Sequence, residues 1–452
     1  MIVAKFGGTS VGTADAIRRL VEIVRGRLYR RPVVVVSALA GITNRLLEVA
    51  EIALGGRPPE AARRLAEIVD RHRAAVADLG LPNDVLGPIA ADSEVAAGWL
   101  ADPGRVPSPD ALRDAIAALG ELWSSRLVAA ALENAGIRSR WVDVRSVIVT
   151  DDRHTRATPD QAEIGRRAGP VFQPFLDAGV VPVTQGFLGA SRAGLTTTLG
   201  RGGSDFTASL LGAALEAERV EIWTDVDGIM TADPRIVPAA RVLPTASHWE
   251  AAELATFGAR VLHPATQAPL IEAKIPCVVL NSFAPDRSGT TVLVGVAPEP
   301  IGRSPVRSIS WKPGITVINV RALRMLGAVG FLRALFDICA EHDASVDVIS
   351  TSEVNVSLTL DAVADLPGLM TDLQRLGEVT LFERRAIVAV VGVGLRGTRG
   401  LAARVFRALA PINVEMISQG ASEINVTMVV LESDGPEAVR LLHHEFFETE
   451  AA

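Results

Sequence analysis

Residues 2–10 read Ile2-Val3-Ala4-Lys5-Phe6-Gly7-Gly8-Thr9-Ser10. The apolar first half of this stretch predicts a strand, and the glycine pair predicts a tight turn after it. Apolar residues at helical spacing then predict a helix over residues 14–27. Four consecutive valines, Val33–Val36, predict a second strand that is buried on both faces. The order strand, turn, helix, strand is how a parallel α/β sheet begins.

Strand-like runs return later in the chain at Arg140–Val144, Val147–Val149, Val180–Thr184, Val220–Thr224, Cys277–Asn281 and Thr290–Val294. Helical patterns separate most of these runs, and residues 45–135 read as a helical segment broken by loops. Alternating strands and helices predict a sheet with crossover connections. We expect this α/β domain to end near residue 297, at a linker rich in Pro and Gly.

Composition limits the classes of function. The chain has 452 residues, of which 48% are apolar, and a formal net charge of −7, which argues against a nucleic-acid partner. Only Cys277 and Cys339 occur, and His263 and His443-His444 lack ligand spacing, so neither a disulfide framework nor a metal site is predicted. We expect a reducing cytoplasm. The sequence shows neither a signal peptide nor about 18 uninterrupted apolar residues, so no membrane span is predicted.

The last third of the chain contains an internal repeat with an offset of about 70 residues. Gly330-Phe331-Leu332 aligns with Gly400-Leu401-Ala402, and Val346–Ser350 aligns with Val414–Ser418. Each copy reads strand, helix, strand, strand, helix. Two copies are too few for a solenoid, so we predict a pair of small α+β modules.

Two glycine-rich stretches are candidates for anion binding. In Lys5–Ser10, glycines after a strand let backbone N–H groups approach a phosphate, and Lys5 can neutralise phosphoryl oxygens. A structural turn with Lys5 in solvent explains the same residues equally well. The second stretch, Thr196–Asp205, enters a helix predicted over residues 207–217 and contains Arg201, which suits a carboxylate. A helix N-cap at Ser204 or Asp205 does not account for its glycines, so together the two loops favour phosphoryl transfer.

Two further stretches are less specific. Trp223–Arg235 follows an apolar strand and is dense in Asp, Gly and Pro, which is typical of loops and also of ligand sites at the carboxyl end of a parallel strand. Gly392–Gly397 matches a dinucleotide-binding fingerprint, with Glu415 at the spacing of a ribose-binding acid. Too few residues follow it for such a domain, and it falls inside the second repeat copy, so we do not expect a dinucleotide site.

Residues 3–11 resemble the aspartokinase signature. The similarity continues through Ser37–Asn44, Gly120–Leu122, Gly200–Asp205, Thr224–Arg235 and Phe257–Pro264. It implies an amino-acid-kinase-type αβα sandwich with a helical segment over residues 1–297. It also implies two ferredoxin-like βαββαβ ACT domains, over residues 313–384 and 385–452. The implied reaction is ATP-dependent phosphorylation of the side-chain carboxylate of L-aspartate to 4-phospho-L-aspartate, the first step towards lysine, threonine and methionine.

The resemblance also assigns site residues. Catalytic roles fall to Lys5 and Asp205. Aspartate would be held by Thr43, Glu121, Arg201, Gly202, Gly203 and Ser204, with Glu121 on its ammonium and Arg201 on a carboxylate. ATP with Mg²⁺ would be held by Lys5, Gly7, Gly8, Ser37, Thr224, Asp225, Met230, Arg235 and Arg260. Met230 replaces a Tyr of some members, and Arg260 replaces a Lys.

The first repeat copy resembles the effector pocket of lysine-sensitive enzymes. The residues concerned are Met325, Gly330, Phe331, Leu332, Ser345, Val346, Asp347, Thr351, Ser352 and Glu353. This implies a homodimer through the ACT domains that lysine inhibits, although the repeat could serve as a dimerisation platform alone. Two other functions compete: a kinase for another acidic amino acid, and a non-catalytic amino-acid sensor. Of the chain's three lysines, Lys274 and Lys312 fall outside every motif.

Overall fold

A computed structural model of the chain describes residues 1–258, 262, 266–295, 304–325 and 329–449. The described residues divide into two compact units. The first unit contains residues Met1–Ile229, Pro244–His248 and Val261–Val296, and the second contains Met230–Leu243, Trp249–Arg260 and Ala297–Ala452. The predicted linker after residue 297 lies largely outside the described residues.

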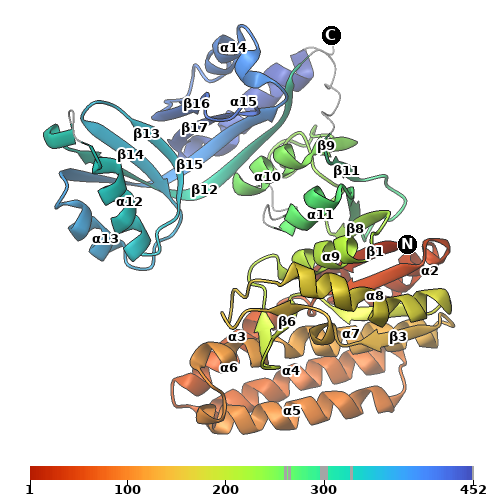
Figure 1. Ribbon diagram of the computed structural model, residues 1–452. Helices are drawn as coiled ribbons and strands as arrows, with labels where there is room; N and C mark the ends of the chain where they lie inside the picture. The colour runs from red at the N-terminus through yellow and green to blue at the C-terminus, as the bar shows by residue number, and fades with distance from the viewer. Residues whose placement is uncertain (259–261, 263–265, 296–303, 326–328, 450–452) are drawn as a thin grey trace. The chain divides into compact units, whose positions relative to one another are not determined.

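The first unit is built on a mostly parallel sheet whose described strands run in the order β3-β5-β2-β1-β8-β10-β11-β9 (Figure 1). Their bounds are β1 (Ile2–Phe6), β2 (Pro32–Val36), β3 (Ser139–Val142), β5 (Val181–Gln185), β8 (Arg219–Thr224), β9 (Thr245–Ser247), β10 (Cys277–Asn281) and β11 (Thr290–Leu293). Strand β1 pairs in parallel with β2 and β8, which puts Lys5 opposite Val35 and Ile222. Every residue of β1 and β2 is buried, which confirms that the apolar runs form central strands.

Helices cover both faces of this sheet. Their bounds are α1 (Gly8–Val11), α2 (Ala14–Arg25), α7 (Leu119–Asn134), α8 (Gln161–Asp177), α9 (Gly203–Ala214) and α11 (Ala268–Ala273). Helices α2 and α7 pack together on one face, and α8 and α9 lie side by side on the other (Figure 1). The predicted αβα sandwich is therefore confirmed.

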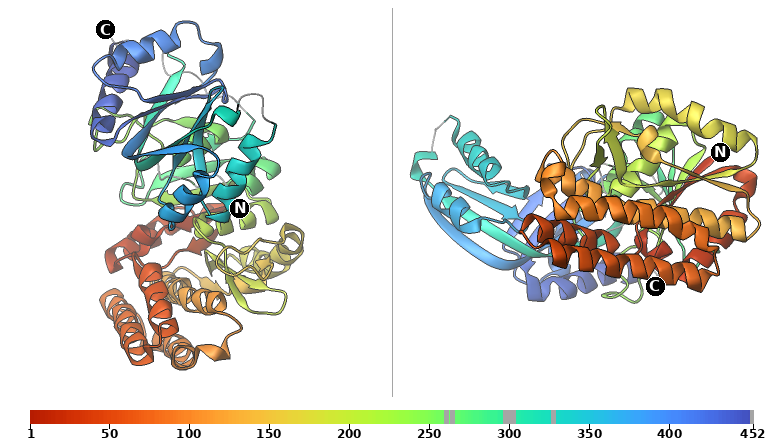
Figure 2. Two further views of the ribbon diagram at one scale, coloured as in Figure 1. Left: turned by 90° about the vertical axis from the view of Figure 1, so that its left-hand side faces the viewer. Right: turned by 90° about the horizontal axis from the view of Figure 1, so that it is seen from below.

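The predicted helical segment is also present. It consists of α3 (Ile42–Leu54), α4 (Pro58–Leu79), α5 (Leu86–Ala101) and α6 (Pro109–Ala117). Helices α4 and α5 lie side by side in all three views (Figures 1 and 2). One described stretch, Pro109–Asn134, is long and apolar enough to cross a membrane, but 83% of its apolar window is buried inside the chain, as in the core of a folded domain.

Three local predictions need correction. Residues 196–198, read as part of a glycine-rich loop, form strand β7 (Thr196–Thr198), which pairs with β6 (Leu188–Ser191) beside β4 (Val149–Thr150). Helix α9 begins at Gly203 instead of residue 207, because Gly202 adopts the left-handed conformation that caps it. The N-cap is thus a glycine backbone, and neither Ser204 nor Asp205 caps the helix.

The second unit contains a sheet whose described strands run in the order β13-β14-β12-β15-β17-β16. The strands are β12 (Val306–Arg321), β13 (Val346–Thr351), β14 (Asn355–Leu360), β15 (Glu378–Gly392), β16 (Met416–Gln419) and β17 (Asn425–Leu431). The helices are α10 (His248–Thr256), α12 (Phe331–Glu341), α13 (Leu366–Leu373), α14 (Leu401–Ala408) and α15 (Gly435–His443). The first residue of α10, His248, belongs to the first unit, and the rest of α10 belongs to the second. Both repeat copies show the predicted order strand, helix, strand, strand, helix.

Strands β12 and β15 are each shared by the two copies. The later half of β12, around Ile318, belongs to the core of the first copy, together with α12, α13 and β14. The earlier half, residues 306–312, pairs with residues 387–392 of β15 and contributes to the core of the second copy. The strand that completes the second copy therefore precedes the first copy in the chain.

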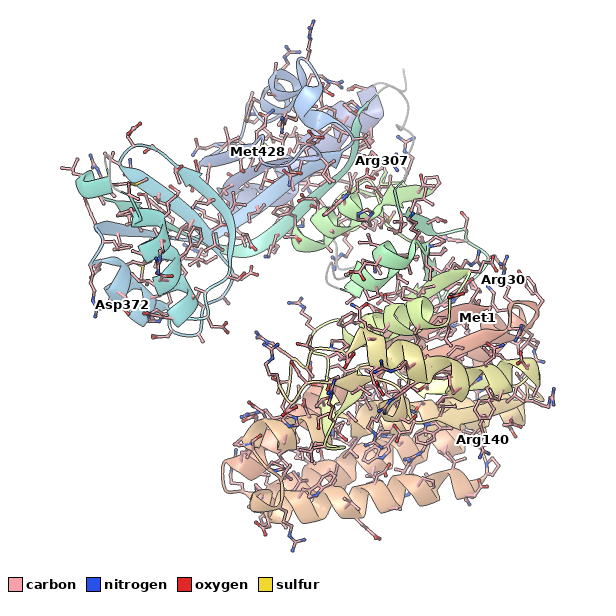
Figure 3. All side chains as sticks on the ribbon, in the orientation of Figure 1. Met1, Arg30, Arg140, Arg307, Asp372 and Met428 are labelled. Carbon is pink, nitrogen blue, oxygen red and sulfur yellow. The ribbon has the colours of Figure 1, made fainter. Side chains whose placement is uncertain are left out.

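A buried ion pair attaches α10 to the second copy. Arg307 of β12, labelled in Figure 3, lies with its Nε 2.7 Å from Oε1 of Glu250 on α10, and both side chains are almost fully buried. A buried ion pair is costly to break from one side, because the remaining charge stays desolvated.

We expect Arg307→Met to lower the free energy of unfolding by about 3 kcal/mol, since Glu250 loses its guanidinium partner. Thermal unfolding followed by circular dichroism measures this. The double variant Arg307→Met/Glu250→Gln removes both charges and should recover part of the loss. A double variant as unstable as the single one would contradict this reason.

Candidate active site

A cavity of about 340 Å³ opens at the carboxyl ends of the central strands of the first unit. Strands β1 and β2, the loop before α3, helix α7 and the start of α9 all reach it. Its lining consists of Lys5, Gly8, Ser37, Ala38, Leu39, Ala40, Gly41, Thr43, Asn44, Glu121, Phe187, Gly200, Gly202, Gly203, Ser204 and Asp205. The edge where parallel strands end is where open α/β sheets bind ligands.

An ion pair joins β1 to α9 inside this cavity. Nζ of Lys5 lies 2.5 Å from Oδ1 of Asp205, and the two side chains are only 11% and 16% exposed. Lys5 thus points inward, which contradicts a structural turn with Lys5 in solvent, and phosphate binding by this loop stays a prediction. Asp205 holds the ammonium at the cavity wall, where it can face an anionic ligand.

Backbone N–H groups supply further positive potential at the start of α9. Gly202 has φ 74° and ends the turn, and the twelve-residue helix begins at Gly203, whose N–H donates to the carbonyl of Gly200 at 3.0 Å. The N–H groups of Ser204 and Asp205 are the first-turn donors left for a ligand in the cavity. A Cβ on Gly203 would lie 2.6 Å from Cδ2 of Phe187, so only glycine allows this close approach. By contrast, α1 after the first glycine pair has only four residues, so Gly7 and Gly8 lead into one short turn.

Glu121 is the second acidic group of the cavity. Its Oε1 accepts a hydrogen bond from the N–H of Ala38 at 3.1 Å, whereas its buried Oε2 has no hydrogen-bond partner among the described residues. Burial raises the pKa of Glu121 to about 8. A buried carboxylate oxygen without a partner is costly. A ligand ammonium entering the cavity would satisfy that oxygen.

The other residues assigned to substrate and nucleotide are distributed around this centre. Ser37 and Thr43 line the cavity, whereas Arg201 is exposed on the turn beside it. Thr224 ends strand β8, directly beside β1, and Asp225 follows it, with the Thr224 hydroxyl donating to the Asp225 carboxylate at 3.2 Å. They share the sheet edge of Lys5 without lining the cavity.

Two predicted nucleotide residues belong to the second unit, and a third is not described. Met230 and Arg235 belong to the second unit, where Ser308 donates to the carbonyl of Met230. Arg235 is exposed, with its guanidinium 2.6 Å from the carboxylate of Asp233. Arg260, like His263, lies outside the described residues. Their roles stay predictions.

The residues assigned to an effector all lie in the first repeat copy. Met325 ends a short helical turn before α12, Gly330 (φ 92°) caps α12, and Phe331 and Leu332 begin it. Ser345, Val346 and Asp347 lead into β13, and Thr351, Ser352 and Glu353 leave it. Across the part of the chain that the structure describes, no three His, Cys, Asp or Glu side chains gather as a metal-binding cluster.

Sequence reasoning missed Phe187 and Asn44 in the lining, and it missed Asp114 behind it. Asp114 on α6 is 1% exposed, and burial raises its pKa. Its carboxylate accepts hydrogen bonds from Thr198 Oγ1 (2.6 Å) and the backbone N–H of Thr155 (3.0 Å), and His154 Nδ1 lies 2.8 Å away. Polar residues on a predicted helix read as solvent-facing, so the pattern gave no signal for Asp114.

The Asp114 contacts support the turn at residues 200–202. Thr198 ends β7 two residues before Gly200, and the carbonyl of Thr155 is 3.2 Å from the position of a Cβ on Gly200. Thr155 itself has φ 67°, a strained backbone for a β-branched residue, and its N–H is held by Asp114. Asp114 therefore positions the turn that presents Arg201 and the start of α9.

Family models, curated proteins and solved structures that are similar to this chain all point to the same family. A family model described as the amino acid kinase family matches residues 1–281, and one described as an ACT domain matches residues 388–446. Lysine-sensitive aspartokinase 3 of Escherichia coli is 40% identical over 456 residues, covering 99% of each chain. Two structures of the E. coli aspartokinase III match at 40% identity, covering 99% of this chain and 100% of theirs. The complex with lysine and aspartate (T-state) has a TM-score of 0.85, and that with aspartate and ADP (R-state) has 0.83.

Glu121→Gln should stabilise the protein at alkaline pH. The pKa of Glu121 in the fold, about 8, exceeds its ordinary value of 4.5, so this carboxyl favours folding below pH 4.5 and loses that contribution as the pH rises through 8. Glutamine keeps the shape and the acceptor for Ala38 without the charge. Thermal unfolding should show equal stability near pH 5 and a gain on the order of 1–2 kcal/mol near pH 8.5. A variant less stable than wild type at both pH values would contradict the burial argument.

Proposed function

The chain belongs to the aspartokinase family, within the wider amino acid kinase family, and we propose on that premise how its own residues perform the reaction. The reaction is ATP-dependent phosphorylation of the side-chain carboxylate of L-aspartate to 4-phospho-L-aspartate, which opens the pathway to lysine, threonine and methionine. The observation that carries the proposal is one cavity containing both the Lys5–Asp205 ion pair and the unpartnered oxygen of Glu121.

Aspartate fits this cavity by charge. The Glu121 carboxylate takes the substrate ammonium, which replaces the missing hydrogen-bond partner of Oε2. Arg201 and Thr43 take a carboxylate, and the backbone N–H of Ser204 at the start of α9 adds a donor. The N–H of Gly203 donates to the carbonyl of Gly200, so Gly202 and Gly203 contribute by setting the turn that presents Ser204 to the cavity.

Phosphoryl transfer needs no general base here. The attacking side-chain carboxylate of aspartate is ionised at neutral pH. It forms a bond to the γ-phosphorus of ATP while the bond to the β,γ-bridging oxygen breaks and ADP leaves with that electron pair. The Lys5 ammonium neutralises the phosphoryl oxygens, and Asp205 keeps the ammonium oriented. Positioning and charge neutralisation provide the catalysis.

The residues proposed for the nucleotide are more widely spread than those proposed for aspartate. Lys5, Gly7, Gly8 and Ser37 lie at the ends of β1 and β2, and Thr224 and Asp225 lie at the adjoining end of β8. The cavity has two carboxylates, and Glu121 is assigned to the substrate ammonium, so Asp205 would be the Mg²⁺ ligand. One carboxylate suffices, because Mg²⁺ keeps water and phosphate oxygens as its other ligands. When bound, Mg²⁺ neutralises charge on those phosphates. Met230, Arg235 and Arg260 complete the proposed nucleotide set.

Regulation is proposed for the second unit. We divide the chain into a kinase domain over residues 1–297 and ACT domains over residues 313–384 and 385–452, with residues 306–312 completing the second ACT sheet. Lysine is the proposed inhibitor, bound by the first copy in a homodimer formed through the ACT domains. The likeness to a lysine-sensitive relative supports lysine as the inhibitor. The buried thiols of Cys277 and Cys339 suit the proposed cytoplasmic location.

The activity is tested by trapping the acyl phosphate with hydroxylamine after incubation with ATP, Mg²⁺ and L-aspartate. We expect product from L-aspartate, inhibited by L-lysine, and we expect Lys5→Ala to lower kcat by about 10³-fold while L-lysine binding persists. Product from glutamate or acetylglutamate alone would favour a kinase for another acidic amino acid. Lysine binding without any product would favour a sensor.

Asp114→Asn tests the support behind the substrate turn. In this variant an NH₂ group replaces Oδ2, so it can no longer accept the Thr155 N–H at 3.0 Å, and that N–H is left to Oδ1, which also accepts from Thr198 Oγ1. We expect the KM for aspartate to rise about tenfold with the KM for ATP within about twofold of wild type, because the turn presents Arg201. Steady-state kinetics with each substrate varied measures both constants. Equal changes in both would indicate general damage to the fold.

A further inference from the structure

Lys312 lies at the junction of the two ACT copies and contacts two acidic side chains. Its Nζ is 2.7 Å from Oδ2 of Asp347, at the start of β13, and 2.8 Å from Oδ1 of Asp361, just after β14. The Lys312 and Asp347 side chains are 20% and 12% exposed, whereas that of Asp361 is 54% exposed. The lysine that fell outside every sequence motif thus occupies a carboxylate of the proposed effector pocket.

The backbone and the side chain of Lys312 belong to different ACT copies. Its backbone pairs with Ile387 in the sheet of the second copy, just before the β12 register shifts between Lys312 and Ile315. Its ammonium reaches across to Asp347 and Asp361 in the first copy. Lys312 therefore links the two copies, through its backbone pairing in the second copy and its ion pairs with Asp347 and Asp361 in the first.

The charges favour competition at Asp347. Two carboxylates and one ammonium leave this group of three side chains with a net charge of −1. Burial raises the pKa of Asp347, and the Lys312 charge opposes that rise. A partly buried carboxylate gains most from the first ammonium that reaches it and less from a second, since two like charges at one carboxylate repel each other.

We propose that Lys312 is an internal competitor of the amino-acid effector: its ammonium holds the Asp347 carboxylate that an effector ammonium must engage, and so sets a high effector threshold. The inference rests on the proposed function, which puts Asp347 in the effector pocket. Asp361 moderates the competition, because it draws part of the attraction of Lys312 away from Asp347. Effector binding then also releases this link between the copies.

The test measures L-lysine binding by calorimetry, and inhibition relative to each variant's own uninhibited rate, with the full chain. Lys312→Met frees Asp347, and we expect the Kd and the inhibitory concentration of L-lysine to fall about tenfold, as for loss of one competing charge-assisted hydrogen bond. Lys312→Arg keeps the charge and should stay within about threefold of wild type. Asp361→Asn leaves Lys312 to Asp347 alone and should raise the Kd several-fold.

The double variant Lys312→Met/Asp361→Asn separates the roles. If Asp361 acts through Lys312, the double variant binds L-lysine as tightly as Lys312→Met alone. An unchanged or higher Kd for Lys312→Met, with wild type binding normally, overturns the competition and leaves the proposed function standing. Wild type that binds no L-lysine overturns both the competition and the proposed regulation by lysine. If Lys312→Met does not fold, Asp361→Asn decides, and an unchanged or lower Kd overturns the inference.

Discussion

The sheet edge that carries the proposed active site depends on the ion pair between Lys5 and Asp205. A lysine on a central strand that is buried along its whole length needs a carboxylate close by, and α9 supplies it from its first turn. That requirement determines where α9 starts. Because α9 starts there, Gly202 adopts a left-handed backbone and Gly203 has no room for a Cβ. The two glycine stretches, far apart in the sequence, are thus the two sides of one contact.

Buried and partly buried acids elsewhere follow the same requirement in different ways. Asp114 is fully engaged by groups of the protein, and it holds a strained loop against the substrate turn. Glu121 is engaged on one oxygen only. Asp347 is engaged by a lysine whose backbone belongs to the neighbouring domain. Of these three acids, Glu121 is the one with a buried oxygen that lacks a partner among the described residues, as expected of a group that binds a ligand and not of one that only holds the fold together.

Local pattern predicted much of the fold. Apolar β-branched runs became β1, β2 and β10, and β10 has the predicted bounds Cys277–Asn281. The repeat predicted two copies of one module. Contacts between residues far apart in the chain have no local sequence pattern. Examples are the pairing of Val306 with Gly392, the hydrogen bonds of Asp114 and the ion pair of Lys312 with Asp347, each of which forms only in the folded unit. The lining of the cavity was predicted where a motif coincides with a strand end, as at Lys5, and was missed where a residue outside every motif, such as Phe187, forms part of the wall.

The division of β12 between two modules has a consequence for synthesis on the ribosome. Residues 306–312 leave the exit tunnel before any of their partners in β15, and the whole first module must be translated before those partners appear. During that interval the first module can close on local contacts, while the early half of β12 waits as an unpaired strand edge. The connectivity of the nascent chain therefore lets the first ACT copy assemble before the second, whose sheet needs residues from both sides of the first copy.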